Sequence, residues 1–229
     1  MSASRILVVG ASRGIGLEFV RQYRADGASV VATARDDAGL ARLAALGAKP
    51  LRLDVLDAAS AAGLAWQIDG EAFDVVIVNA GVIGPRTQGL EPPAQADFDT
   101  VMRTNVLGPM RVLPAVAEAL AKARGDALPV VAILTSRMGS MGLRTNPGSW
   151  LYRASKAAAN SVAKDAALAL AGRATCLALH PGWVRTDMGG PEADIEVGES
   201  VAGMRATIAA ATPAQTGGFF DHDGTPLAW

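Results

Sequence analysis

Short runs rich in Val, Ile and Leu alternate with Ala-rich stretches along most of the chain, and this alternation restricts the fold more than any other feature. Such runs are typical of strands buried on both faces of a parallel sheet, and the stretches between them have the composition of helices. Strands are expected at residues 5–10, 29–34, 50–54, 74–79, 129–135, 175–180 and near 218–221. Helices are expected at residues 15–25, 38–46, 58–68, 94–123, 150–171 and 197–210. The pattern predicts one α/β domain over residues 1–229, with a doubly wound, seven-stranded, mainly parallel sheet flanked by helices.

Two kinds of interruption stand out in this pattern. The helical stretch 94–123 contains Pro109 and Pro114, which predicts a kink or two separate helices. The least regular stretches are residues 82–93, 137–149 and 185–196, and each follows an expected strand. They should therefore meet at the carboxyl edge of the sheet, where doubly wound folds bind their ligands.

The composition limits the class of protein. Of the 229 residues 50% are hydrophobic and 19% charged, as in a globular domain, and the net charge of −1 gives no reason to expect nucleic acid. One cysteine, Cys176, permits no internal disulfide and suits a reducing compartment. The start of the chain shows no signal-peptide layout, and no apolar run reaches the roughly 18 residues of a membrane helix. A soluble, cytoplasmic protein without membrane contact is expected.

The strongest indication of chemistry is the sequence Tyr152-Arg-Ala-Ser-Lys156, because it sets a phenol and an ammonium four residues apart. In the expected helix, positions i and i+4 share one face, so Lys156 lies near Tyr152. A cation there favours the phenolate and should lower a pKa that starts at about 10. Tyr152 is therefore a candidate proton donor, although an exposed helix face can carry such a pair without any function.

The turn after the first expected strand is rich in glycine. It reads Gly10-Ala-Ser-Arg-Gly14-Ile-Gly16 and opens the first expected helix. Glycine allows the backbone to turn tightly and to approach a pyrophosphate, whose charge suits a helix N-terminus. The spacing differs from G-x-G-x-x-G, and a glycine-rich turn can also serve packing alone.

In the order and spacing of six motifs, the chain resembles the short-chain dehydrogenase/reductase family over nearly its whole length. The matching residues are Gly10, Gly14 and Gly16; Asp54-Val55; Asn79-Ala80-Gly81; Asn105; Ser136 with Tyr152 and Lys156; and Pro181-Gly182 with Thr186. The run Ala32–Arg35 and the ending Gly218–Trp229 are similar to the carbonyl-reductase-like branch that includes sniffer and the C-factor signalling proteins. The resemblance implies a Rossmann-type domain that binds NAD(P). The expected cofactor-binding residues are Gly10, Ser12, Arg13, Gly14, Ile15, Gly16, Arg35, Asp54, Val55, Asn79, Ala80, Gly81, Tyr152, Lys156, Pro181, Gly182, Val184 and Thr186.

The resemblance also implies roles for four catalytic residues. Tyr152 would protonate the developing alkoxide, and Ser136 would hold the carbonyl oxygen in line. Lys156 would act on the Tyr152 pKa and reach the nicotinamide ribose, and Asn105 would anchor a water that supplies protons to Lys156. Ser140 and Ser155 are alternatives to Ser136, but only Ser136 directly ends a strand.

The loop between Ser136 and Tyr152 is a few residues longer than the family's commonest arrangement. Met138, Met141, Trp150 and Trp183 would either line a substrate pocket there or belong to the core. Arg144 would either meet an acidic substrate or be a solvated loop residue.

Residues near the end of the second expected strand favour NADPH over NADH. NAD enzymes place an acid there for the ribose 2′-hydroxyl, whereas this strand ends Ala34-Arg35. Arg13 adds a second cation, and two arginines suit a 2′-phosphate. Asp36 and Asp37 are acids near this point, but both should begin the next helix.

The leading functional hypothesis is therefore an NADPH-dependent reductase of a small-molecule carbonyl compound, active as a homodimer or homotetramer through the 94–123 and 150–171 stretches. The alternative is a nucleotide-binding signalling protein of the C-factor kind with little turnover. Neither histidine, His180 nor His222, has Cys or acidic partners at ligand spacing, so no metal site is expected.

Overall fold

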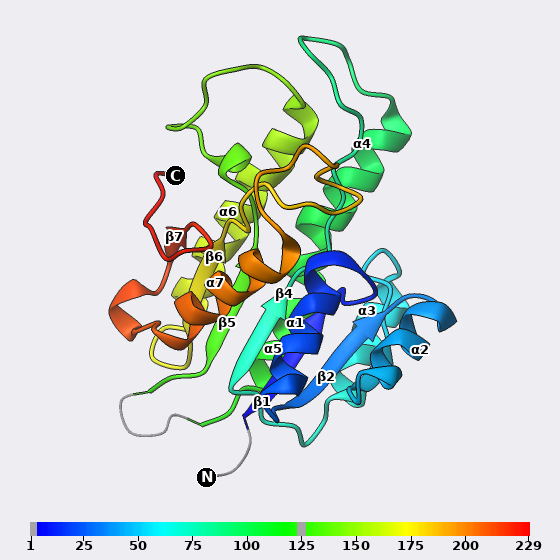
Figure 1. Cartoon of the computed structure of the whole chain (residues 1–229), viewed down its shortest axis with the longest axis vertical. Helices are drawn as coiled ribbons and strands as arrows, with labels where there is room; N and C mark the ends of the chain where they lie inside the picture. Colours follow the sequence, from blue (N-terminus) through cyan, green and yellow to red (C-terminus); the bar gives the residue numbers. More distant parts are fainter. Residues whose placement is uncertain (1–3, 123–126) are drawn as a thin grey trace.

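Seven strands form one sheet in the described part of the chain, which comprises residues 4–122 and 127–229 of the computed structural model. The strands are β1 (Arg5–Val9), β2 (Ser29–Ala34), β3 (Lys49–Arg52), β4 (Val75–Val78), β5 (Val130–Leu134), β6 (Thr175–Leu179) and β7 (Gly218–Phe220). Their order is β3-β2-β1-β4-β5-β6-β7, and every neighbouring pair is parallel. The chain begins in the middle of the sheet, moves outward to β3 and returns to β4 (Figure 1). The predicted doubly wound sheet is confirmed, and it is fully parallel.

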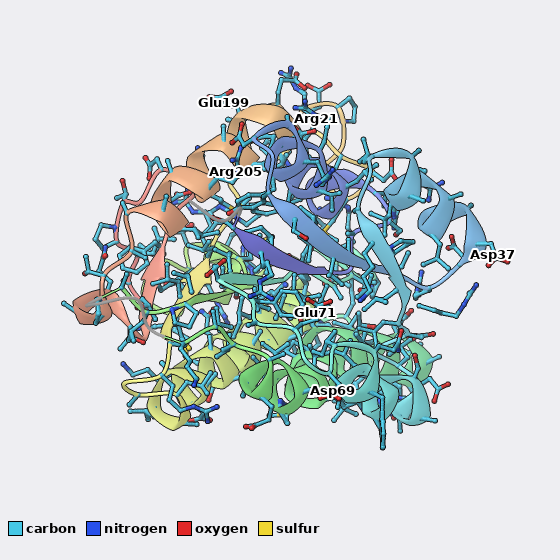
Figure 2. The ribbon with its side chains drawn as sticks, turned by 90° about the horizontal axis from the view of Figure 1, so that it is seen from below. Arg21, Asp37, Asp69, Glu71, Glu199 and Arg205 are labelled. Atoms are coloured by element: carbon cyan, nitrogen blue, oxygen red, sulfur yellow. The ribbon has the colours of Figure 1, made fainter. Side chains whose placement is uncertain are left out.

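Helices cover both faces of the sheet. Helices α1 (Gly14–Ala25), α2 (Asp37–Ala45) and α7 (Val197–Ala209) lie on one face; α3 (Ala58–Gln67), α5 (Gly108–Glu118) and α6 (Trp150–Ala169) lie on the other. Figure 2 shows these layers, with Arg21 of α1 and Arg205 of α7 on the side opposite Asp69. Both layers exclude water from the strands, which explains why the strands are apolar at successive positions.

The alternation of side chains along β1 shows how the core divides. Ile6 and Val8 pack with the α1 and α7 layer, whereas Leu7 and Val9 pack with the α5 and α6 layer. All four side chains are fully buried. At roughly 1.5–3 kcal/mol for a buried aliphatic side chain, such strands account for much of the stability of the fold.

The predicted helical stretch 94–123 is divided into two α-helices. Helix α4 (Gln95–Met102) passes through a π turn (Arg103–Leu107) into α5. Pro109 is tolerated because it stands in the first turn of α5, directly after the π turn, and Pro114 lies inside the same helix. The expected division into two helices is therefore confirmed, and it falls at a π turn that contains Asn105.

The other predicted boundaries agree with the structure within two residues, the usual uncertainty at the ends of elements. Helix α5 ends at Glu118, before the predicted end of the 94–123 stretch, and Ala123 itself lies outside the described residues, as do residues 1–3. In the described ranges, no helix combines the length and the apolar character that a membrane span requires.

Candidate active site

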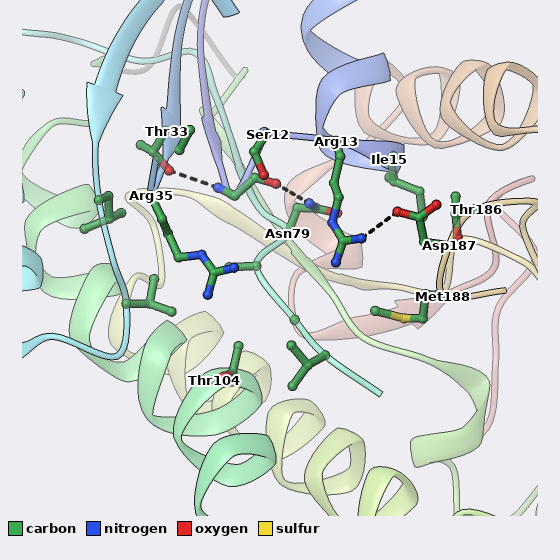
Figure 3. A pocket seen from close by; sticks show the side chains of 18 of the residues that line it. Ser12, Arg13, Ile15, Thr33, Arg35, Asn79, Thr104, Thr186, Asp187 and Met188 are labelled. Atoms are coloured by element: carbon green, nitrogen blue, oxygen red, sulfur yellow. Dashed lines mark hydrogen bonds and ion pairs between the residues drawn. The ribbon is translucent and has the colours of Figure 1, made fainter. Parts of the chain in front are cut away.

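A cleft of about 290 Å³ opens at the carboxyl edge of the sheet, beside the point where the strand order reverses between β1 and β4. Figure 3 shows side chains from the glycine turn, the end of β2 and the segment after β6 around one space. Twelve predicted cofactor residues line it: Gly10, Ser12, Arg13, Gly14, Ile15, Arg35, Asp54, Val55, Asn79, Ala80, Gly81 and Thr186. This is the position at which open α/β sheets bind their ligands.

The glycine turn has the geometry that a dinucleotide requires. Gly10 has a φ of +83°, and a Cβ on it would lie 2.7 Å from the Ala80 Cα, so only glycine fits. The Gly10 N–H donates to the Thr33 hydroxyl at 3.0 Å, and Asn79 Nδ2 donates to the Gly10 carbonyl at 2.6 Å (Figure 3). Helix α1 begins at Gly14 and has no acid in its first turn, so its N-terminus suits an anion. The residues present therefore fit the pyrophosphate of NAD(P).

Four predicted cofactor residues support the cleft without lining it. Gly16 is buried behind the turn, where a Cβ would collide with the Gly10 carbonyl. The Pro181 carbonyl accepts a hydrogen bond from Ser200, and Gly182 packs under Ile195. Val184 is buried as well. These residues fix the position of Thr186, which does reach the cleft.

Sequence reasoning missed ten of the lining residues. They are Thr33, Ala34, Leu53, Leu56, Val82, Thr104, Arg185, Asp187, Met188 and Val197. Seven of them, including Thr104 beside Asn105 and Asp187 beside Thr186, adjoin predicted residues, so extending each motif by one position would have found them. Thr33, Met188 and Val197 have no predicted neighbour, and only the tertiary structure brings them to the cleft.

Two arginines hold the cleft wall that follows β3. Arg111 Nη1 donates to the carbonyls of Val55 and Leu56, both at 2.9 Å. Arg103 Nη2 donates to the same Leu56 carbonyl at 3.0 Å. A Cβ on Gly108 would lie 3.1 Å from the Val55 side chain, so the wall packs closely on the start of α5. The wall formed by Val55 and Leu56 is thus fixed to the π turn and to α5.

The charges at the end of β2 agree with the sequence analysis. The exposed Arg35 side chain extends into the cleft in Figure 3. Asp36 is the N-cap of α2 and accepts from the Gly39 N–H at 2.7 Å, and Asp37 forms an ion pair with Arg52. Both acids therefore begin the helix as predicted, and Arg35 is the charged residue directly after β2 that lines the cleft.

The four predicted catalytic residues come together beside Gly81, and none of them is among the residues that line the cleft. Asn105, Ser136, Tyr152 and Lys156 are all buried, and Tyr152 is only 7% exposed. The link to the cleft is Gly81, where a Cβ would lie 3.3 Å from Asn105 Oδ1 and 3.4 Å from Lys156 Nζ. Residues from three separate segments of the sequence thus form one cluster in the structure.

The expected effect of Lys156 on the pKa of Tyr152 is wrong for this structure. Burial raises the pKa of Tyr152 to about 12, and a hydrogen bond with Ser136 opposes this rise. Burial also lowers the pKa of Lys156 to about 8. Lys156 Nζ lies 5.8 Å from the centre of the Tyr152 ring and donates to the Leu134 carbonyl at 3.1 Å. At neutral pH the pair is therefore a neutral phenol beside an ammonium, which is the form that donates a proton.

Asn105 joins three parts of the site. Its Oδ1 accepts from the Val82 N–H, and its Nδ2 donates to the Val82 carbonyl, both at 2.8 Å. The same Nδ2 donates to the Ser155 hydroxyl at 2.9 Å, and Ser155 in turn donates to the Tyr152 carbonyl. These bonds support a structural role for Asn105, which holds Val82 and the start of α6 in place. The water that Asn105 is expected to anchor stays a prediction.

The three candidate serines differ in their hydrogen-bond partners. The Ser155 hydroxyl accepts from Asn105 Nδ2 and donates to the Tyr152 carbonyl. Ser140 donates to the Trp229 main-chain oxygen at 3.1 Å and accepts from the Leu143 N–H at 3.0 Å. Ser136 is the serine that bonds to Tyr152, which favours it as the catalytic one.

The loop between Ser136 and Tyr152 is held by a buried arginine. Arg153 Nε donates to the Gly148 carbonyl and Nη2 donates to Asn146 Oδ1, both at 2.7 Å. Met141 is 72% exposed and Trp183 is 48% exposed, so neither belongs to the core.

No three His, Cys, Asp or Glu side chains gather in a metal-binding arrangement within residues 4–122 and 127–229.

The chain is similar in sequence to several known proteins. The sequence pattern of the family described as short chain dehydrogenase matches residues 4–196. C-signal of Myxococcus xanthus is 44% identical over 158 residues, which is 68% of this chain and 92% of that protein. A 1-hydroxy-2-glutathionyl-2-methyl-3-butene dehydrogenase of Rhodococcus sp. (strain AD45) is 34% identical over 99% of this chain and 100% of its own length.

Solved structures are similar over the whole fold. A short-chain dehydrogenase/reductase from Burkholderia multivorans with bound NADP has a TM-score of 0.88 and 32% identity, with both chains fully covered. The carbonyl reductase Sniffer of D. melanogaster has a TM-score of 0.87 and 29% identity at the same coverage. A carbonyl reductase from Pseudomonas aeruginosa PAO1 in complex with NADP has a TM-score of 0.82 and 34% identity, again over both whole chains.

Proposed function

Since the chain belongs to the short-chain dehydrogenase family and is one of its oxidoreductases, we propose that it is an NADPH-dependent reductase of aldehydes or ketones. The observation that carries the proposal is the buried cluster of Asn105, Ser136, Tyr152 and Lys156 beside Gly81. A protein that only binds a nucleotide has no chemical need for a buried phenol paired with a serine and an ammonium.

NADPH, when bound, supplies the hydride that reaches the carbonyl carbon. The residues of this chain perform the other tasks. Ser136 donates a hydrogen bond to the carbonyl oxygen and orients it, and Tyr152 gives its proton to that oxygen as the alkoxide develops. The Lys156 ammonium stabilises the phenolate that Tyr152 becomes until a proton from solvent restores the phenol, and Lys156 binds the ribose next to the nicotinamide. The product is the alcohol, and the same residues serve the reverse oxidation.

NADPH consumption should be measured with purified protein over aldehydes, ketones, quinones and keto esters. Turnover of at least one class, lost in the Tyr152→Phe variant, is the expected result. Tight NADPH binding without turnover of any class would favour the second candidate, a nucleotide-binding signalling protein. The specific support for that candidate is the 44% identity to C-signal. A cytoplasmic location belongs to the proposal as well, and fractionation of the native cells tests it.

The cofactor preference is expected to depend on Arg35. Replacing Arg35 with Ala should weaken NADPH binding about tenfold or more, because a charge-assisted hydrogen bond to a phosphate is worth about 1.5–3 kcal/mol. NADH lacks the 2′-phosphate, so its affinity should hardly change. Fluorescence titration with both cofactors measures this, and Arg173→Ala, outside the cleft and paired with Glu118, is the matched control. Equal or better catalytic efficiency with NADH in the wild-type protein would refute the preference.

The chain is expected to form a homodimer or homotetramer. Helices α5 and α6 bury one side against the sheet, yet Met110 on α5 and Leu168 on α6 stay exposed. A second copy that covers these side chains would remove apolar surface from water. Light scattering should therefore show a multiple of 23.4 kDa, and Met110→Glu should shift it toward the single chain. A lone 23.4 kDa species at micromolar concentration would contradict this expectation.

A further inference from the structure

Asp187 is an acid in a cleft that otherwise suits a polyanion. It lies on the segment Arg185–Met188 after β6, and all four residues of this segment line the cleft. Its carboxylate accepts a hydrogen bond from Arg13 Nη1 at 2.5 Å, across the cleft from the glycine turn (Figure 3). A carboxylate near a bound phosphate costs free energy through like-charge repulsion unless a cation neutralises it, as Arg13 does here, so the pair calls for an explanation.

Asp187 is the one side-chain partner of Arg13 within the described residues. The other acid that lines the cleft, Asp54, is engaged locally and accepts from the Leu56 N–H at 2.9 Å. Asp187 is thus the lining acid that pairs with a cation of the cleft.

The segment that carries Asp187 is held independently of this ion pair. The Arg185 N–H donates to the Ile195 carbonyl, and the Gly190 N–H donates to the Thr186 carbonyl. Arg86 Nη2 also donates to the Met188 carbonyl at 2.6 Å. Removing the charge of Asp187 should therefore free Arg13 without displacing the segment.

We propose that Asp187 tunes cofactor preference by competing with the 2′-phosphate of NADPH for Arg13. This inference rests on the proposed NADPH-dependent function and on the sequence-based expectation that Arg13 joins Arg35 at that phosphate. When NADPH binds, Arg13 exchanges the carboxylate for the phosphate, and the lost ion pair reduces the net gain. NADH has a hydroxyl in place of the phosphate and leaves the pair intact. Asp187 consequently lowers the affinity for NADPH and leaves the affinity for NADH unchanged.

The exposure of the two side chains sets the size of the effect. Arg13 is 69% exposed and Asp187 is 80% exposed, so their attraction is that of a surface ion pair. Such pairs are worth about 0.2–1 kcal/mol, and Asp187→Asn should therefore tighten NADPH binding up to about fivefold.

A double-mutant cycle tests the proposal. The dissociation constants of NADPH and NADH are measured by fluorescence for the wild type, Asp187→Asn, Arg13→Gln and the double variant. Asp187→Asn should tighten NADPH about two- to fivefold and leave NADH unchanged, and it should have no effect on NADPH in the Arg13→Gln background. The control Glu118→Gln removes a charge from an exposed ion pair with Arg173 outside the cleft, and it should not reproduce the gain.

Four results would overturn the proposal. Unchanged NADPH affinity in Asp187→Asn, together with weaker NADPH binding in Arg13→Gln, would refute the competition and leave the phosphate role of Arg13 intact. An equal gain with NADH, or a gain that persists without Arg13, would show that Asp187 acts by another route. Unchanged NADPH affinity in Arg13→Gln would remove the premise and count against the proposed assignment of Arg13 itself.

Discussion

Replacing Tyr152 with Phe should lower turnover by about 10²- to 10⁴-fold, because the change removes the proton donor and little else. The ring that fills the buried site remains, so NADPH affinity should stay within about twofold of the wild type. Steady-state NADPH oxidation with a carbonyl substrate measures the first quantity, and fluorescence titration measures the second.

The chain supplies a matched control, since it has two tyrosines. Tyr23 lies on α1 against Phe19 and Arg205, and burial raises its pKa to about 12, as it does for Tyr152. Tyr23 does not line the cleft. Tyr23→Phe should therefore keep its turnover. Turnover within a few-fold of the wild type in Tyr152→Phe would end the assignment of Tyr152 as the proton donor.

Lys156→Ala should have a second defect besides slow turnover. Loss of the ammonium should reduce the rate by about 10²-fold or more, and loss of its bonds to the ribose should weaken NADPH about tenfold or more. Lys164→Ala on the same helix, whose ammonium donates to the Gly217 carbonyl, is the control and should change neither quantity. If Lys156→Ala binds NADPH as tightly as the wild type, Lys156 has no part in holding the cofactor.

The pH dependence gives this prediction a separate test. Burial lowers the pKa of Lys156 to about 8, so the free wild-type enzyme loses this charge as the pH rises through that value. The contribution of the ammonium to NADPH affinity is then fully present below pH 8 and fades above it. Affinity measured from pH 6 to pH 10 should fall in the wild type, and this component of the fall should be missing in Lys156→Ala.

The parts of the candidate site that the structure brings together as expected depend on local sequence. The glycine turn could be recognised because Gly10 and Gly14 follow a strand directly, and the choice of Ser136 over Ser140 and Ser155 followed from its place at a strand end. The helical spacing of Tyr152 and Lys156 likewise placed both residues in one cluster. Sequence order alone was enough for the doubly wound sheet, since each strand is followed by a helix.

The parts that were missed depend on contacts between distant segments. The raised pKa of Tyr152 results from burial by the whole fold, which the spacing of two residues cannot reveal. Asp187 reaches Arg13 from 174 positions away, so no motif joins them. The prolines predicted the division of the 94–123 stretch into two helices, but not the π turn in which Asn105 bonds to Val82.

The π turn between α4 and α5 also has a consequence for protein engineering. A π turn amounts to one extra residue in an α-helix, and deleting one residue would restore the regular spacing. The helix would then be more regular, but Asn105 would rotate away from Val82 and Ser155, and Arg103 would lose its register with Leu56. Stability and activity therefore place opposite demands on residues Arg103–Leu107. A redesign for heat resistance should leave this turn unchanged and alter the outer surfaces of α3 or α7 instead.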